Sequence, residues 1–218
     1  MLDLLLLPTV AFFLLRVLIR AGNRRNIPLI SLLLAMALAN AGFHLSVLGL
    51  IAVPAMSALY AELALILMVV SIMTGRVVPM FTKNVTPGLV IQVSRRFELT
   101  LLAVTAVTLS LWVLGAPAWL VLPASALSAA LHALRLWKWH PRVTLRRPIL
   151  GILHFSYAWM PVGFALLALA QPGWVAPSLA VHAFGVGVIG GLIIGMITRT
   201  ARGPTGRPLQ ASRGEVVA

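Results

Sequence analysis

Long runs of apolar residues, separated by short polar segments, dominate the sequence. Seven runs reach about 18 residues or more, the length needed to cross a hydrocarbon core roughly 30 Å thick. They lie near residues 2–19, 28–52, 56–76, 98–115, 118–137, 148–170 and 177–198. None shows the sustained apolar–polar alternation of a membrane β-barrel strand. The pattern predicts an all-α, polytopic transmembrane helix bundle, with one helical domain over residues 1–200 and a tail over 201–218.

Composition supports this interpretation and excludes several others. Hydrophobic residues make up 61% of the chain, charged residues only 10%, and the mean hydropathy is +1.02. A soluble protein has about half apolar and a quarter charged residues, so we expect a lipid bilayer as the surroundings. The net charge of +13 would suggest nucleic acid in a soluble protein. Here the basic residues form short clusters between apolar runs, which excludes a nucleic-acid partner.

The basic clusters also predict how the chain is oriented. Lys and Arg follow every second run, at Arg20, Arg24 and Arg25; at Arg76, Lys83, Arg95 and Arg96; at Lys138, Arg142, Arg146 and Arg147; and at Arg199, Arg202, Arg207 and Arg213. The other connections contain none. Because cytoplasmic loops carry the Lys/Arg excess, we expect the N-terminus outside and the C-terminus, with the tail, in the cytoplasm. Pro79, Pro87 and Gly88 predict an irregular cytoplasmic loop from Arg76 to Arg96.

Polar residues inside the runs indicate functional sites, because an ionisable group is costly in lipid. His44, Glu62 and His182 fall in the outer half of the predicted bundle, and Asn40 shares a helical face with His44. Two imidazoles and a carboxylate suit a metal such as copper or zinc, or a proton relay. A hydrogen-bonded cluster that joins helices is equally compatible with this pattern.

A second polar layer falls in the inner half. His132 and His154 lie on consecutive runs, with Arg135 and Arg147 on the same helical faces and nearer the cytoplasm. Two neutral imidazoles suit the axial positions of a haem, and two guanidinium groups suit its propionates. Spacing alone favours the simpler role of anchoring helix ends at the interface.

Two absences narrow the chemistry that the chain can perform. The chain has no cysteine, which excludes disulfides, thiolate metal sites and iron–sulfur clusters. Motifs of soluble enzymes are also missing, and no catalytic residue is predicted.

Gly187, Gly191 and Gly195 form a ridge that permits close approach of a neighbouring helix. At about 100° per residue this ridge points nearly opposite His182.

Several blocks of sequence resemble the NnrS family, polytopic bacterial membrane proteins that contain haem and copper and are linked to nitric oxide. The blocks are Gly75–Asn84, His154–Pro161, Gly195–Arg199 and Gly203–Leu209. Weaker matches, at Asn40 with His44, at Leu131–Ala133 and at His182–Ala183 with Gly187 and Gly190, follow in the expected order.

The resemblance implies a haem- and copper-binding protein of the bacterial inner (cytoplasmic) membrane that acts in the response to nitric oxide and nitrosative stress. It favours His132 and His154, with Arg135 and Arg147, as haem-related, and His44 and His182, with Glu62, as metal-related. It does not say which pair serves which cofactor.

Length leaves other interpretations open. The resemblance implies that members of the family have about a dozen spans and a further histidine-rich block in their N-terminal portion. This sequence lacks that block, so it is interpreted as an N-terminally truncated member. A second hypothesis is a proton-relaying transporter or channel-like module, suggested by Glu62. A third is a non-catalytic helical module that requires a missing N-terminal segment or another membrane subunit.

Overall fold

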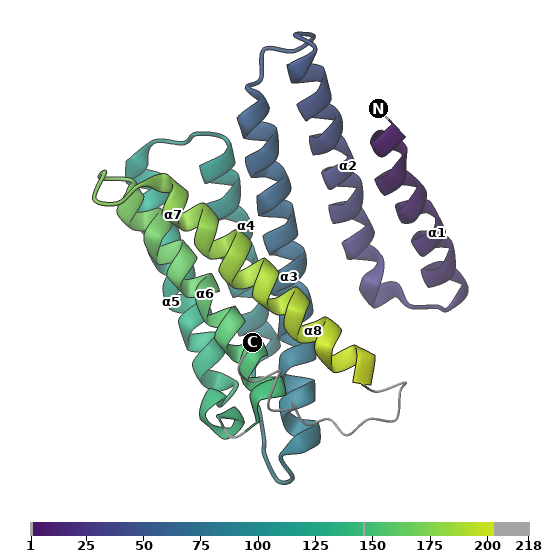
Figure 1. Cartoon of the computed structure of the whole chain (residues 1–218), viewed down its shortest axis with the longest axis vertical. Helices are drawn as coiled ribbons and strands as arrows, with labels where there is room; N and C mark the ends of the chain where they lie inside the picture. The colour runs from purple at the N-terminus through teal and green to yellow at the C-terminus, as the bar shows by residue number, and fades with distance from the viewer. Residues whose placement is uncertain (1, 146, 203–218) are drawn as a thin grey trace. The chain divides into compact units, whose positions relative to one another are not determined.

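The computed structural model describes residues 2–145 and 147–202, and these residues fold into helices, without a strand among them (Figure 1). The elements are η1 (Leu2–Leu5), α1 (Leu6–Arg20), η2 (Arg24–Asn26), α2 (Ile27–Val47), α3 (Ala55–Val85), α4 (Arg95–Val113), α5 (Ala118–Lys138), η3 (Pro141–Thr144), α6 (Pro148–Ala170), α7 (Pro177–His182), η4 (Ala183–Gly190) and α8 (Gly191–Arg202). The η elements are short 3₁₀ helices, except η4, which is a π-helix. The all-α prediction is confirmed.

Six segments of the described chain are long and apolar enough to cross a membrane. They are Ile27–Val47, Ala55–Val85, Arg95–Val113, Ala118–Lys138, Pro148–Ala170 and Pro177–Ala201, and each matches one of the predicted runs. The predicted run 2–19 forms η1 and the 15-residue α1. Together they extend from Leu2 to Arg20, a length of about 30 Å at roughly 1.5 Å per residue in α1 and 2.0 Å in η1. That this run also spans the membrane stays a prediction.

The predicted loop differs in the structure, and the predicted tail lies outside the described residues. Helix α3 runs 31 residues, through Pro79 to Val85, where an irregular loop was expected. Val78 and Thr82 are buried at 2% and 0% exposure, and their packing offsets the lost hydrogen bond at Pro79. The tail beyond Arg202, with its block Gly203–Leu209, lies outside the described residues, as do Arg146, Arg207 and Arg213.

The chain divides into two compact units. The first contains residues 1–69 and 109–115. In it α1 packs on α2, and Tyr60 of α3 contacts Trp112 of α4, with ring centroids 4.9 Å apart. Large apolar side chains such as Phe12 and Leu38 stay exposed, at 60% and 74%, which is the pattern of helices that face lipid.

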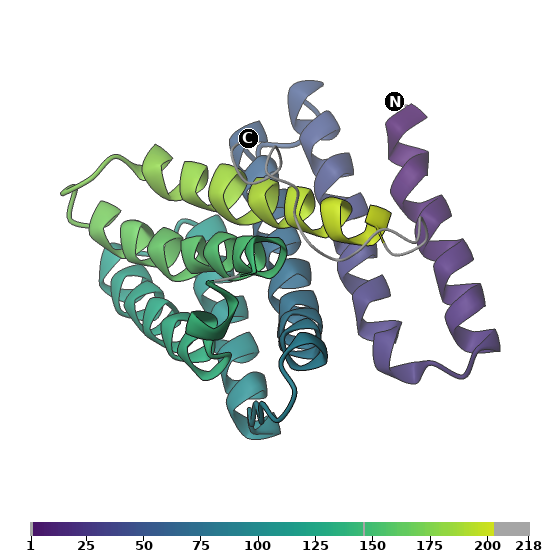
Figure 2. The same ribbon diagram turned by 60° about the horizontal axis from the view of Figure 1, so that its bottom comes forward.

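The second unit contains residues 70–108 and 116–218. Helix α6 is its centre, packed between α5 and the segment formed by α7, η4 and α8 (Figure 2). Leu153, Tyr157, Met160 and Phe164, one helical turn apart, are all at 0% exposure. The polar cluster and the groove described below both include residues of α6.

The glycine ridge lets the last segment approach α6 closely. A Cβ at Gly187 would overlap Trp159, one at Gly191 would overlap Ser156, and one at Gly195 would come within 2.9 Å of Leu153. These contacts confirm that the ridge is a packing surface. His182 at the start of the segment is exposed.

Candidate functional site

A buried polar cluster joins α3, α4, α5 and α6 in the second unit. Arg135 of α5 is only 1% exposed. Its Nε donates to Glu98 Oε1 at 3.0 Å and its Nη2 donates to Glu98 Oε2. Its Nη1 donates to the Ser71 carbonyl at 2.9 Å and to the Tyr157 hydroxyl at 3.2 Å. This two-bond pairing with a carboxylate is the geometry that guanidinium favours, so Glu98 neutralises the buried cation.

Small and aromatic residues shape the space around Arg135. A Cβ at Gly75 would overlap the guanidinium group, so the glycine of the Gly75–Asn84 block makes room for it. The guanidinium carbon lies 5.1 Å from the ring centroid of Trp139 and 5.8 Å from that of Tyr157. Such contacts stabilise a desolvated cation further.

The hydrogen bonds of His132 determine its tautomer. The Thr105 hydroxyl donates its hydrogen to the Leu101 carbonyl at 2.7 Å, so it accepts from His132 Nε2 at 3.0 Å. With the proton on Nε2, Nδ1 accepts from the Tyr157 hydroxyl at 2.6 Å. The ring is fully buried and stacks on Phe164, 5.3 Å between centroids. Both ring nitrogens are therefore occupied.

These bonds form a directed chain, which we call the Arg135–Thr105 chain. Arg135 donates to Tyr157, Tyr157 donates to His132, and His132 donates to Thr105. The last hydroxyl donates to the carbonyl of Leu101 within its own helix. The chain thus links Glu98, near the start of α4, to Thr105, about two turns further along the same helix.

His154 of α6 is buried but less firmly bonded. Its Nδ1 donates to the Leu150 carbonyl at 3.2 Å. Its Nε2 lies 3.5 Å from the Thr82 hydroxyl, which donates its hydrogen to the Val78 carbonyl at 2.8 Å. The ring of His154 also interacts with the backbone of Trp139.

The four residues predicted for haem are only partly brought together. His132, His154 and Arg135 belong to one buried cluster, whereas Arg147 is exposed at the N-terminus of α6. Ring contacts connect the two histidines through Tyr157 and Trp139. The ring centroids are 5.8 Å apart for His132 and Tyr157, 4.5 Å for Tyr157 and Trp139, and 6.4 Å for Trp139 and His154. The two imidazoles are therefore joined by packed aromatic rings, and their nitrogens do not face each other across a cavity.

The residues predicted for a metal are divided between the two units. In the first unit, His44 Nε2 and Asn40 Nδ2 contact Asp3 Oδ2 at 2.7 and 3.3 Å, which confirms that His44 and Asn40 share a face. Glu62 lies half-buried on α3 in the same unit, and His182 belongs to the second. In the part of the chain that is described, no group of three or more His, Asp or Glu side chains is arranged to hold a metal ion.

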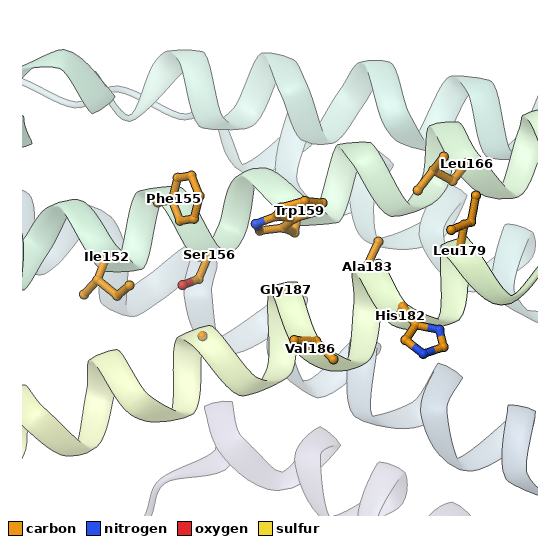
Figure 3. Close-up of a pocket in the computed structure, with 11 residues that line it drawn as sticks. Ile152, Phe155, Ser156, Trp159, Leu166, Leu179, His182, Ala183, Val186 and Gly187 are labelled. Carbon is orange, nitrogen blue, oxygen red and sulfur yellow. The ribbon is translucent and has the colours of Figure 1, made fainter. Parts of the chain in front are cut away.

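A groove runs along the second unit between α6 and the α7–η4 segment (Figure 3). Its volume is about 450 Å³, and its walls are almost entirely apolar, with Phe155, Trp159, Leu179 and Val186 among them. His182 lies at one end of the groove. Grooves of this size and character suit small apolar ligands or cofactors.

His182 has the hydrogen bonding typical of a ligating imidazole. Its Nδ1 donates to the Ser178 carbonyl at 2.8 Å, and its Nε2 has no partner in the described chain. Metal-bound histidines characteristically hold their second ring nitrogen in this way. The π-helix η4 begins at the next residue, and π segments often occur at functional sites.

Sequence reasoning named the intramembrane histidines but missed their partners. Glu98, Tyr157 and Ser71 complete the Arg135 cluster, and Asp3 completes the His44 contact. Glu98 carried a signal, because it is one of only 4 acidic residues in the chain and begins a predicted run. Tyr157 carried none beyond its place in the His154–Pro161 block.

Comparison with known proteins identifies the sequence at the level of the family. The model of the NnrS protein family matches residues 1–218, the whole chain. Searches of curated proteins and of solved structures found no match.

Proposed function

The chain belongs to the NnrS family, and on this premise we propose that it is a haem- and copper-binding membrane protein of the response to nitric oxide and nitrosative stress. The match of the family over residues 1–218 is the observation that carries this proposal. The six apolar helices support a bilayer environment. We place the protein in the bacterial inner membrane, with no nucleic-acid partner.

His182 is the residue that best fits a haem. Its Nε2 would hold the haem iron, the Ser178 carbonyl holds the ring in place, and the apolar groove suits the macrocycle. A bound haem would supply an iron able to bind a small gas such as nitric oxide. The groove walls would exclude water from that site.

The predicted pair of His132 and His154 fits a haem less well. Ligation through either nitrogen of His132 requires loss of its hydrogen bond to Tyr157 or Thr105, at a cost of about 1 kcal/mol or more. Arg135 is already paired with Glu98, so it is not available to a propionate. Arg147 is exposed at the N-terminus of α6, whereas His182 lines the groove beside Leu166, near the other end of that helix.

For copper we propose His44 and Glu62 as contributing ligands, joined by a residue from elsewhere. His44 offers an imidazole held by Asp3, but the described residues do not form a closed set of three ligands. The present residues alone therefore do not fit a complete copper site. Another membrane subunit is the proposed source of the remaining ligand.

Optical spectra and metal analysis test the cofactor proposal. We expect the chain, purified in mild detergent, to show reduced haem bands and to contain copper. His182→Ala should abolish the haem bands, whereas His140→Ala, in an exposed connection, should leave them unchanged. Loss of the bands in His132→Ala or His154→Ala instead would restore the inner pair as the haem ligands. Absence of both haem and copper from the wild type would contradict the proposal.

Part of the Arg135–Thr105 chain favours proton relay as a second candidate function. The Tyr157 hydroxyl donates to His132, and His132 donates to Thr105, which is the order of donors and acceptors that a proton relay needs. Arg135 donates to both Glu98 and Tyr157, and a guanidinium group keeps its protons, so Glu98 lies outside this path. The path ends on the Leu101 carbonyl, so conduction needs rotation of the Thr105 hydroxyl. A pH-driven flux in proteoliposomes that is lost in Tyr157→Phe or Glu62→Gln would favour this function over cofactor binding.

A further inference from the structure

Arg199, near the end of α8, is a buried cation for which the described residues supply no hydrogen-bond acceptor. The residue is 7% exposed, and its Nη1 is enclosed and has no partner in the described structure. Its guanidinium carbon lies 3.9 Å from the ring centroid of Phe81, on α3. The ring offsets part of the desolvation cost, but it cannot accept the N–H hydrogens in the plane of the guanidinium group. Buried polar groups in proteins are normally hydrogen-bonded, so we expect the Nη1 group of Arg199 to have an acceptor.

Carboxylates of the chain do not supply that partner within the described part of the second unit. The sequence has 4 acidic residues, namely Asp3, Glu62, Glu98 and Glu215. Asp3 and Glu62 belong to the first unit, and both oxygens of Glu98 are bound by Arg135. Glu215 lies outside the described residues. An anion from another source is therefore required, or Glu215 itself.

The position of Arg199 indicates the kind of anion. It lies two residues before the end of the span Pro177–Ala201, and Phe81 lies four before the end of the span Ala55–Val85. Because the two side chains touch, both helix ends reach the same boundary of the bilayer. The exposed Lys83 adds a second positive charge on α3. Phosphate groups of lipids occupy this depth, and basic pockets between transmembrane helices bind them.

We propose that Arg199, stacked on Phe81, forms a binding site for a phosphoryl anion, with the headgroup of an anionic phospholipid as its source. Phe81 holds one face of the planar guanidinium group and leaves its edge to donate parallel N–H bonds to phosphate oxygens. The anion supplies the acceptor that residues 2–145 and 147–202 do not provide. This site is independent of the haem and copper proposal, because it uses none of the same residues.

Thermal unfolding of the purified chain in detergent tests the site. Phosphatidylglycerol should raise the unfolding midpoint, while uncharged diacylglycerol with the same acyl chains should not. An equal rise with inorganic phosphate would support the phosphoryl site with a free anion as its ligand. No rise with either phosphate-bearing probe would overturn the proposal.

Substitutions separate the site from general attraction of lipid to a basic protein. Arg199→Gln should weaken the response to phosphatidylglycerol about tenfold, since one charge-assisted contact is lost, and Arg199→Lys should weaken it less. Arg142→Gln is the matched control, because Arg142 also lies over an aromatic ring, 5.2 Å from Trp137, but is exposed. An equal loss in Arg142→Gln would overturn the proposal.

Two further variants keep the test decisive. If Arg199→Gln fails to fold, Phe81→Leu retains the charge and should still weaken the lipid response by removing the stacked ring. Glu215→Gln tests the internal alternative. A lowered unfolding midpoint in Glu215→Gln without any lipid, at unchanged lipid response, would show that the chain supplies its own anion and would contradict the proposal.

Discussion

The pairing of Arg135 with Glu98 makes a direct prediction for stability. In Glu98→Ala the guanidinium group stays buried without its counter-ion, and breaking a buried pair costs about 3–5 kcal/mol. We expect a loss near the lower end, about 3 kcal/mol, because the Glu98 side chain is 24% exposed. Unfolding in detergent monitored by circular dichroism measures it. Glu98→Gln keeps an acceptor and should lose less; wild-type stability in Glu98→Ala would contradict the pairing.

Tyr157 occupies the centre of the Arg135–Thr105 chain, since its hydroxyl accepts from Arg135 and donates to His132. Tyr157→Phe leaves both groups with an unmet hydrogen bond in a buried site, and we expect a destabilisation of about 1–3 kcal/mol. Tyr60→Phe is the control, because the Tyr60 hydroxyl has no hydrogen bond in the described structure and its ring packs on Trp112. Equal effects of the two changes would contradict the directed chain.

Single residues also show where prediction from sequence ends. His132, His154 and Arg135 were identifiable because ionisable groups are rare in apolar runs. Their bonding was not, because it depends on how each helix is rotated. Tyr157 lies three residues from His154 in sequence, yet it bonds to His132 on the neighbouring helix. The free Nε2 of His182 likewise follows from a local bond to Ser178 that composition does not reveal.

At the scale of elements, η4 offers a test of the glycine ridge. Gly187→Ala places a methyl group against Trp159, and overpacking of this kind costs about 1–3 kcal/mol. Gly185→Ala is the matched control in the same π-helix, since a Cβ there meets nothing within 4 Å. We expect it to be neutral or stabilising by up to about 1 kcal/mol. Unfolding midpoints in detergent compare the two, and a reversed order would contradict the close packing on α6.

Hydropathy predicted most elements well, and the one error, at Pro79, has a physical cause. Six predicted runs match helices that can span a membrane, because continuous apolar sequence favours a helix in lipid. The first run is also helical, as η1 followed by α1. Pro79 predicted the end of a helix, but α3 continues through it because Val78 and Thr82 are buried. This burial depends on neighbouring helices and cannot be predicted from the local sequence.

For the whole molecule, the absence of cysteine makes the predicted orientation easy to test. Single cysteines at Pro172, between α6 and α7, and at Leu145, between α5 and α6, are exposed and lie on opposite predicted sides. A membrane-impermeant thiol reagent should label Pro172→Cys in intact cells. It should label Leu145→Cys only after permeabilisation. The reverse pattern would contradict the orientation inferred from the basic clusters.

The central claim, that the chain carries a haem with His182 as its ligand and meets nitric oxide there, is tested most directly by a spectral titration. Nitric oxide is added to the reduced, detergent-purified protein while the Soret band is recorded. The account predicts a saturable shift of that band, absent in His182→Ala and retained in His140→Ala. A wild-type spectrum that nitric oxide leaves unchanged, or a shift of full size in His182→Ala, would contradict it.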